Sequence, residues 1–246
     1  MLNLLAAGYN HGEIANKRLE ITNRIIGESE CLKGGSITCL AANDLELLFR
    51  LYDELFLHYW FRDCFKGKMK FSLSKRMTKS AGLTLCPKNI AKLKPEDLVI
   101  EIRIGVDFFF QYNEVSGTKM VCGIKTNDAL EALLLVFEHE LCHVLEFINY
   151  KSSSCRGTRF KQLAANLFGH RESYHKLLTN KQIAGHNLGI RVGDMVSFSF
   201  KGQRLTGVIY NINKRATVMV RNSRGTLIDS KGNRYSRYYV PLTQLK

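Results

Sequence analysis

The sequence has few prolines, no Cys-x-x-Cys pair and no long run of apolar residues. Its 3 prolines among 246 residues leave little room for an extended proline-rich linker. The absence of paired cysteines argues against a zinc ribbon. No apolar stretch approaches the roughly 20 residues that span a bilayer, and no basic region precedes the short apolar run at the N-terminus. We therefore expect neither membrane insertion nor secretion.

Cysteine is present, but not in the pattern of a disulfide-rich protein. The 7 cysteines are odd in number and widely spaced, which argues against a disulfide framework. We expect them to be reduced, as in an intracellular protein of the cytoplasm or nucleus. The cysteines are Cys31, Cys39, Cys64, Cys86, Cys122, Cys142 and Cys155.

Acidic residues are scarce in the last two-fifths of the chain. Residues 1–150 carry 18 Lys and Arg against 19 Asp and Glu, whereas residues 151–246 carry 18 against 3. The net charge of +14 therefore belongs entirely to the second segment. Such a concentrated positive field attracts polyanions, chiefly nucleic acid, with an anionic membrane surface as the next candidate. Charge that serves only solubility is the remaining alternative.

The hydrophobic pattern predicts a mixed α+β chain. With 45% hydrophobic residues, the protein can bury a sizeable core. Asp128 and Glu131 form a capping box before a long apolar segment, which indicates a buried helix. Helical spacing predicts helices over 14–26, 45–61, 129–148 and 160–168. Alternating apolar residues predict strands over 69–74, 81–86 and 98–106.

Four or five short strands within residues 190–246 predict a small twisted barrel. This segment carries 11 Lys and Arg against 2 acidic residues, interleaved with tyrosines. Cations that contact phosphates and rings that stack on bases suit sequence-tolerant nucleic-acid binding, although tyrosines are also ordinary barrel residues. The tyrosines are Tyr210, Tyr235, Tyr238 and Tyr239. The expected contacts are Lys201, Arg204, Lys214, Arg215, Arg234 and Arg237.

The segment His139-Glu140-Leu141-Cys142-His143 lies inside the predicted buried helix. Residues four apart stack one turn above the other, so both imidazoles can reach one divalent ion. A zinc ion held in this way needs a third protein ligand and leaves a position for a water, whose proton Glu140 would take as general base. The alternative is a pair of core histidines satisfied by backbone or carboxylate contacts.

Residues 44–177 resemble the SprT-like zinc metallopeptidases, the group that includes the DNA–protein crosslink protease Spartan. The resemblance rests on the order LELLFRLYDELFLHYWF, MKFSLSKRMTKSAGLTLC, LVIEIRIGV, LEALLLVFEHELCHVLEF and RGTRFKQLAANLFGHRESYH. It implies a zincin-like fold with His139 and His143 as zinc ligands and Glu140 as catalytic acid/base. The segment from Gly189 to Val220 is similar to the SH3-like barrels that follow this domain in some relatives.

The chain departs from that family at the third ligand. The usual histidine of a His-Gly-x-x-Phe motif is replaced by Arg156, and a guanidinium cannot coordinate zinc. Cys155 is the nearest substitute, because a thiolate is a good zinc ligand. His170 is a second candidate, but it lies about 20 Å along a helix that starts near Arg156. We expect His170 and His175 to be surface or cap residues.

The sequence therefore predicts an N-terminal extension at 1–40, a SprT-like metallopeptidase domain at 41–180 and a basic SH3-like barrel at 190–246. The first hypothesis is a zinc endopeptidase that cleaves proteins bound or crosslinked to nucleic acid, chiefly DNA, with the strand at 98–106 as an edge for an extended substrate. The second is an inactive SprT-like protein that only binds nucleic acid. A third treats the basic part as a membrane-surface or protein-docking module. The oligomeric state is left open.

Overall fold

The computed structural model describes residues 8–246 and divides the chain into two compact units, one ending at Leu177 and the other beginning at Leu178. Each unit has its own hydrophobic core. The predicted mixed α+β class is confirmed, because helices and several sheets are both present. No described helix is long and apolar enough to cross a membrane.

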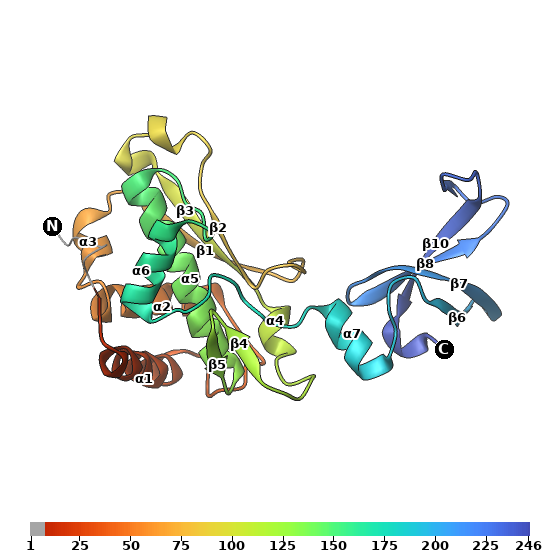
Figure 1. Ribbon diagram of the computed structural model, residues 1–246, viewed down its shortest axis with the longest axis horizontal. Helices are drawn as coiled ribbons and strands as arrows, with labels where there is room; N and C mark the ends of the chain where they lie inside the picture. The colour runs from red at the N-terminus through yellow and green to blue at the C-terminus, as the bar shows by residue number, and fades with distance from the viewer. Residues whose placement is uncertain (1–7) are drawn as a thin grey trace. The chain divides into compact units, whose positions relative to one another are not determined.

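The first unit packs helices against a three-stranded sheet (Figure 1). Its helices are α1 (His11–Glu28), α2 (Ala42–Leu55), α3 (Trp60–Cys64), α4 (Asp107–Phe110), α5 (Ala129–Tyr150) and α6 (Thr158–Phe168). Its strands are β1 (Lys68–Ser74), β2 (Gly82–Leu85), β3 (Val99–Gly105), β4 (Lys119–Val121) and β5 (Ile124–Thr126). The short 3-10 helices η1 (Ile90–Lys92) and η2 (Pro95–Asp97) lie between β2 and β3.

The expectation that the strand at 98–106 forms an edge is wrong. The sheet order is β1-β3-β2, so β3 lies in the centre, parallel to β1 and antiparallel to β2. Ile100, Ile102 and Ile104 of β3 are fully buried. Alternation in a sequence shows which face of a strand is covered, but it does not show which strands flank it. The edge strands of this sheet are β1 and β2.

Helix α5 begins where the sequence predicts it. The Asp128 side chain accepts a hydrogen bond from the backbone N–H of Glu131 at 2.8 Å, and the helix ends at Tyr150, followed by the cap residue Lys151 with a left-handed φ of 58°. Most of the residues from Ala129 to Glu146 are buried, and the helix packs against β2, α4 and α6. The helix that carries the two candidate ligand histidines is therefore the central element of this unit.

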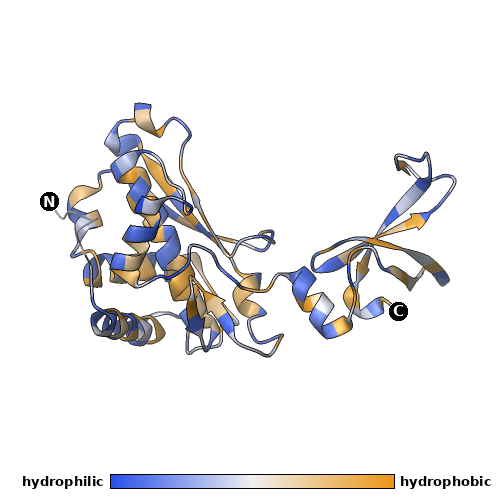
Figure 2. Ribbon diagram, in the orientation of Figure 1, coloured by the Kyte–Doolittle hydropathy of each residue, from blue (hydrophilic) through white to orange (hydrophobic). Residues whose placement is uncertain are grey.

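The segment predicted as an N-terminal extension contributes to this core. Helix α1 is amphipathic, with hydrophilic and hydrophobic residues mixed along its length (Figure 2). Its buried residues Ile14, Ile21 and Ile25 belong to the main hydrophobic cluster, and the helix packs on α2. The first unit thus includes α1.

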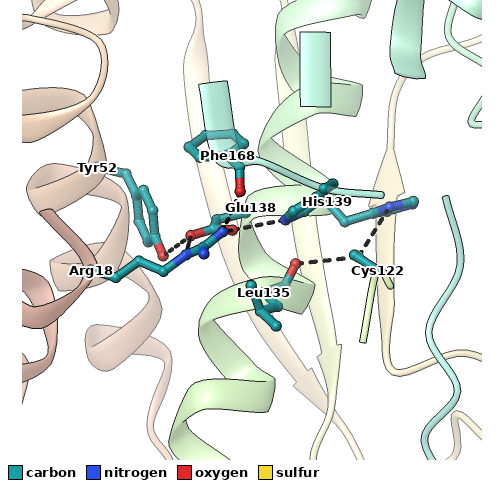
Figure 3. A network of polar contacts seen from close by, with 8 residues as sticks. Arg18, Tyr52, Cys122, Leu135, Glu138, His139 and Phe168 are labelled. Carbon is teal, nitrogen blue, oxygen red and sulfur yellow. Dashed lines mark hydrogen bonds and ion pairs between the residues drawn. The ribbon is translucent and has the colours of Figure 1, made fainter. Parts of the chain in front are cut away.

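A buried ion pair ties α1 to α5 (Figure 3). Arg18 donates two hydrogen bonds to the fully buried Glu138 carboxylate, at 2.7 and 2.6 Å. Tyr52 donates to the same carboxylate at 2.9 Å, and His170 Nε2 lies 2.8 Å from it. Burial acts to raise the pKa of Glu138, but the charge and hydrogen bonds of Arg18, with His170, hold it below its usual range. This network fixes α5 at Glu138, the residue directly before His139.

Replacing Arg18 by alanine is expected to destabilise the protein by about 3–5 kcal/mol, because it leaves the Glu138 charge buried without its partner. The lowered pKa of Glu138 means that its contribution is present above the ordinary carboxyl pKa and is lost as pH falls through the folded value. Urea unfolding at neutral and acidic pH measures both effects, and the difference from wild type should shrink in acid. Arg24→Ala, which removes only partly exposed ion pairs, is the control and should cost about 1 kcal/mol or less.

The expectation of reduced cysteines fails at one pair. Cys31 and Cys39 form a disulfide across the loop between α1 and α2, with their Cα atoms 5.0 Å apart. The loop folds back because Ser29 accepts hydrogen bonds from the N–H groups of Cys31 and Leu32 and donates one to Asp44. A single bonded pair within a loop has no distinctive spacing, so the sequence pattern did not reveal it.

The second unit is an antiparallel five-stranded sheet with a short helix, α7 (Asn180–Leu188). The sheet order is β6-β7-β8-β10-β9. Its core contains Val196, Phe198, Ile209 and Val218. The strands are β6 (Met195–Phe200), β7 (Gln203–Ile212), β8 (Arg215–Arg221), β9 (Leu227–Ile228) and β10 (Arg234–Pro241), followed by the 3-10 helix η3 (Leu242–Gln244).

Candidate metal centre

The two histidines of the sequence motif face each other on α5. Their Nε2 atoms lie 3.2 Å apart, and the His139 side chain is almost fully buried. Burial lowers the pKa of His143 to about 4, and it holds the pKa of His139 still further below its usual range. Both rings are therefore neutral near pH 7, the form in which an imidazole nitrogen binds a metal.

Hydrogen bonds orient the His143 ring. Its Nδ1 lies 2.6 Å from the Ser153 hydroxyl, and that hydroxyl donates to the buried Glu146 carboxylate at 2.6 Å. Ser153 has a single proton, which it gives to Glu146, so it must accept the Nδ1–H of His143. Arg159 donates to the other Glu146 oxygen at 2.7 Å. The chain of contacts leaves the lone pair of His143 on Nε2, as in the outer shell of metal sites.

A weaker contact orients His139, and it comes from Cys122, the residue directly after β4. Cys122 Sγ lies 3.8 Å from the Leu135 carbonyl, to which it donates, and 3.9 Å from His139 Nδ1 (Figure 3). A sulfur that donates its proton to Leu135 can accept the Nδ1–H of His139. This tautomer places the lone pair of His139 on Nε2 as well.

These two nitrogens fit a zinc ion. Two nitrogens at about 2.0–2.1 Å from a tetrahedral zinc lie about 3.3 Å from each other. The observed Nε2–Nε2 distance is 3.2 Å. Without a cation, two lone pairs at this distance would repel each other. The residues present therefore match the donor set that the motif predicts.

Cys155 is the third donor that the structure brings to this pair. Suitable atoms of His139, His143 and Cys155 all lie within 4.8 Å of one another. Cys155 lies in the turn before α6, and Arg156, which stands where the SprT-like motif has a histidine, is exposed. His170 instead contacts Glu138 in the buried network. Of the two candidates for the third ligand, only Cys155 groups with both motif histidines.

A second donor group shares His139 but not His143. Suitable atoms of Cys122, His139 and His175 also lie within 4.8 Å of one another, and the rings of His139 and His175 are 4.5 Å apart. Burial raises the pKa of the Cys122 thiol well above its usual range, so this thiol stays protonated. Burial also lowers the pKa of His175 to about 3. The group with Cys155 contains both motif histidines, whereas this group contains only one of them.

His170 caps the end of α6, because its N–H donates to the Ala164 carbonyl at 3.2 Å, but the expectation of surface side chains at His170 and His175 is wrong. His170 is 5% exposed, and the buried Nε2 of His175 has no hydrogen-bond partner among the described residues. His175 reaches the site because its segment pairs with β4, through a bridge to Val121 and a hydrogen bond from the Cys122 N–H to Tyr174. No local spacing signals this pairing between segments more than 50 residues apart.

Glu140 is held by the edge strand β2. Thr84 Oγ1 donates to the Glu140 carboxylate at 2.7 Å. Burial raises the pKa of Glu140 to about 7, and the hydrogen bond from Thr84 opposes this rise. A carboxyl group with this pKa can both accept and release a proton near neutral pH. Gly82 leaves room for this side chain, since a Cβ there would stand 2.8 Å from Glu140 Cγ and 2.8 Å from a methyl of Val136.

Replacing Gly82 by alanine is expected to push Glu140 from its position while leaving the candidate ligands in place. Under the endopeptidase hypothesis, cleavage should fall by about 100-fold, as for a misplaced catalytic group, with zinc content unchanged. Activity and zinc per chain are measured on the same preparation. Gly34→Ala is the matched control, because a Cβ at Gly34 has no neighbour within 4 Å. Full activity in Gly82→Ala would contradict this role.

A cavity of about 220 Å³ opens onto the candidate metal ligands. It is lined by His139, Cys155 and His175, together with Ser80, Ala81 and Tyr174. A larger pocket of about 850 Å³ lies elsewhere in the same unit, and no histidine or cysteine lines it. The chemistry of the lining residues therefore selects the smaller cavity as the site.

The residues predicted to contact nucleic acid occupy different positions in the second unit. Arg215 and Arg237 are exposed on one face of the sheet, while Lys201 and Lys214 lie in the turns that flank β7. Arg204 donates to Ser197 on the neighbouring strand at 2.9 Å. Arg234 donates to the Gly225 carbonyl at 3.2 Å. Sequence reasoning missed Arg221, which alternation on β8 places on the same face as Arg215.

No family model, no curated protein and no solved structure matches this chain.

Proposed function

We propose that this protein is a zinc-dependent endopeptidase, of zincin-like and SprT-like type, that cleaves proteins bound or crosslinked to nucleic acid. The observation that carries the proposal is the convergence of His139 Nε2, His143 Nε2 and a Cys155 donor beside the buried Glu140. A zinc ion held by these three residues would supply Lewis-acid activation of water and of a peptide carbonyl.

The chain's own residues account for the other steps. Glu140, with its raised pKa, takes a proton from the attacking water and delivers it to the departing amine nitrogen. Strand β2 is an edge of the sheet and carries Thr84, which holds Glu140. An extended substrate can therefore pair with β2 and pass beside the cavity at His139. This assigns to β2 the role first expected of the strand at 98–106.

We propose that the second unit is an SH3-like barrel that holds the enzyme on nucleic acid, with DNA as the principal partner. Its sheet is curved toward closure, because Ser197 of β6 and the C-terminal Lys246 exchange backbone hydrogen bonds at 2.9 and 3.0 Å. Residues 178–246 carry 12 Lys and Arg against 2 Asp. This density of positive charge favours phosphate contacts over a role in solubility.

The test is cleavage of a DNA-binding protein by the zinc-loaded chain, with and without DNA. We expect cleavage that depends on DNA and decreases as salt rises, because both proteins must occupy the same DNA. DNA binding without cleavage under any of these conditions would favour the alternative, an inactive protein of the same type. Arg156 at the usual ligand position is the observation that keeps this alternative in view.

A further inference from the structure

The outer face of the five-stranded sheet is separate from its core face. In β8, Ala216, Val218 and Val220 are buried, whereas the alternate residues point to the other side. Arg215 and Arg221 on that side are exposed. Residues paired on neighbouring strands point to the same face of a sheet. The pairing register therefore identifies the outer-face residues of β7 and β10 as well.

Two exposed tyrosines lie on this outer face. Tyr239 of β10 pairs with Thr217 of β8, and Asn211 of β7 pairs with Thr217 from the other side. A β-bulge between Ile209 and Asn211 places Tyr210 beside this row, where it is 69% exposed, and Tyr239 is 61% exposed. Alternation after the buried Ile209 already points Tyr210 to solvent, and the bulge keeps Asn211 on the same face before Ile212 returns to the core.

A guanidinium lies beside the two rings. Arg237 pairs with Met219 one step along the same face, and its Nη1 donates to the Tyr239 hydroxyl at 3.3 Å. The hydrogen bond to Tyr239 raises the pKa of Arg237, with a smaller contribution from Tyr210, so both phenol groups are near this cation. The cluster of Tyr210, Tyr239 and Arg237, with Arg215 at the end of β8, is called here the tyrosine platform.

The other two tyrosines of this unit have structural partners. Tyr235 donates to Asp229 at 3.0 Å. Tyr238 packs against the rings of Phe198 and Phe200, with centroids 5.5 and 5.1 Å away. The structure thus separates two tyrosines that are free to stack from two that hold the fold.

No acidic side chain of the second unit, residues 178–246, competes for the cations of the platform. The two acidic residues of the second unit are Asp194 and Asp229. Asp194 accepts from the Arg191 N–H, and Asp229 accepts from Asn233 and Tyr235. Both carboxylates are satisfied within their own loops, so the platform combines exposed rings with positive charge.

We propose that the tyrosine platform is a binding site for single-stranded nucleic acid, whose unpaired bases stack on Tyr210 and Tyr239 while Arg215 and Arg237 contact phosphates. This inference rests on the proposed nucleic-acid association of the second unit and names its substrate class. Unpaired bases expose their faces, whereas the bases of a duplex are already stacked on each other. Two tyrosines on strands two positions apart are separated by about 10 Å, so each ring can take its own base.

The test measures binding of the full chain to three labelled probes: oligo-dT, an oligonucleotide of the same length with abasic sites, and a duplex. We expect wild type to bind oligo-dT more tightly than the abasic probe. The double variant Tyr210→Ala/Tyr239→Ala should lose affinity for oligo-dT by about 30-fold or more, from the loss of base stacking. Its affinity for the duplex and the abasic probe should stay within about twofold, and its salt dependence should not change.

One arginine variant provides the complementary readout. Arg237→Ala should weaken binding to all three probes and reduce the slope of log K against log salt by about 1. Ile228→Ala, which removes another exposed apolar side chain of the same sheet, is the matched control and should change nothing. Circular dichroism and thermal unfolding verify that each variant remains folded.

The possible outcomes distinguish base stacking on the tyrosine platform from the underlying proposal that the second unit binds nucleic acid. If the tyrosine double variant binds oligo-dT as tightly as wild type does, the stacking role is overturned, even if Arg237→Ala still loses binding. An equal loss on all three probes would also overturn it. Failure of wild type to bind any probe would overturn both the platform and the nucleic-acid association.

Discussion

Glu140→Gln should reduce cleavage of a DNA-bound protein by about 10²–10⁴-fold, the range expected when a general base is removed. Glutamine has nearly the same shape and can still contact Thr84, but it cannot accept the proton of the attacking water. The Glu140 carboxylate is buried and accepts a hydrogen bond from Thr84 Oγ1 at 2.7 Å. Zinc content should be unchanged, because Glu140 is not among the grouped metal donors.

The measurement compares initial rates of cleavage with zinc per chain and DNA affinity on the same preparations. Glu96→Gln is the matched control, because Glu96 is exposed on η2 in the loop between β2 and β3. Cleavage by Glu140→Gln at the wild-type rate would exclude its role as base. Equal and negligible cleavage by wild type and Glu140→Gln, with DNA affinity intact, would support the inactive alternative.

Cys155→Ser should weaken zinc binding by more than the roughly 10–100-fold that removal of an outer partner causes. The reason is that Cys155 completes the group around the two Nε2 atoms, and a serine hydroxyl is a much poorer zinc ligand than a thiolate. His139→Ala and His143→Ala should have effects at least as large. Ser153→Ala, which removes only the contact that orients His143, should fall within the 10–100-fold range.

Zinc affinity is measured by competition with a chromophoric chelator, a readout that needs no protease activity. Cys64→Ser is the control, because Cys64 is exposed on α3. Cys122→Ser and His175→Ala distinguish the two donor groups that share His139. If these variants lose zinc and Cys155→Ser does not, the ion is held by the other group. Equal and negligible zinc in wild type and every variant would refute the metal centre.

Part of the site could be predicted from the sequence. What could be predicted depended on how many residues separate the side chains that meet. The spacing of His139 and His143 within one helix was sufficient to predict that the two rings meet. Cys155 could be suggested because it lies only 12 residues after His143, in the turn before the next helix. His175 could not be suggested, since it reaches His139 through pairing with β4. The same limit hid the ion pair between Arg18 and Glu138, which are 120 residues apart.

The fold shows the same division. The helices predicted over 14–26, 129–148 and 160–168 and the strands at 69–74, 81–86 and 98–106 form, because propensity and periodicity are properties of neighbouring residues. The helix predicted over 45–61 is instead divided into α2 and α3, since His58 and Tyr59 adopt left-handed φ values of 52° and 62°. The strand at 98–106 was expected at the edge of the sheet but lies in its centre, and the role of α1 in the core was not foreseen. Strand order depends on which apolar faces can be buried together, a property of the whole unit and not of any one strand.

The sequence by itself determined the helix that carries His139, Glu140 and His143, the concentration of positive charge after residue 150 and the short strands of the basic unit. Only the tertiary structure decided which donor joins the two histidines, which strand holds Glu140 and which tyrosines remain exposed. The physical reason is the range of the forces involved. Backbone geometry fixes side chains a few residues apart, whereas contacts between distant segments arise only when a common core is packed.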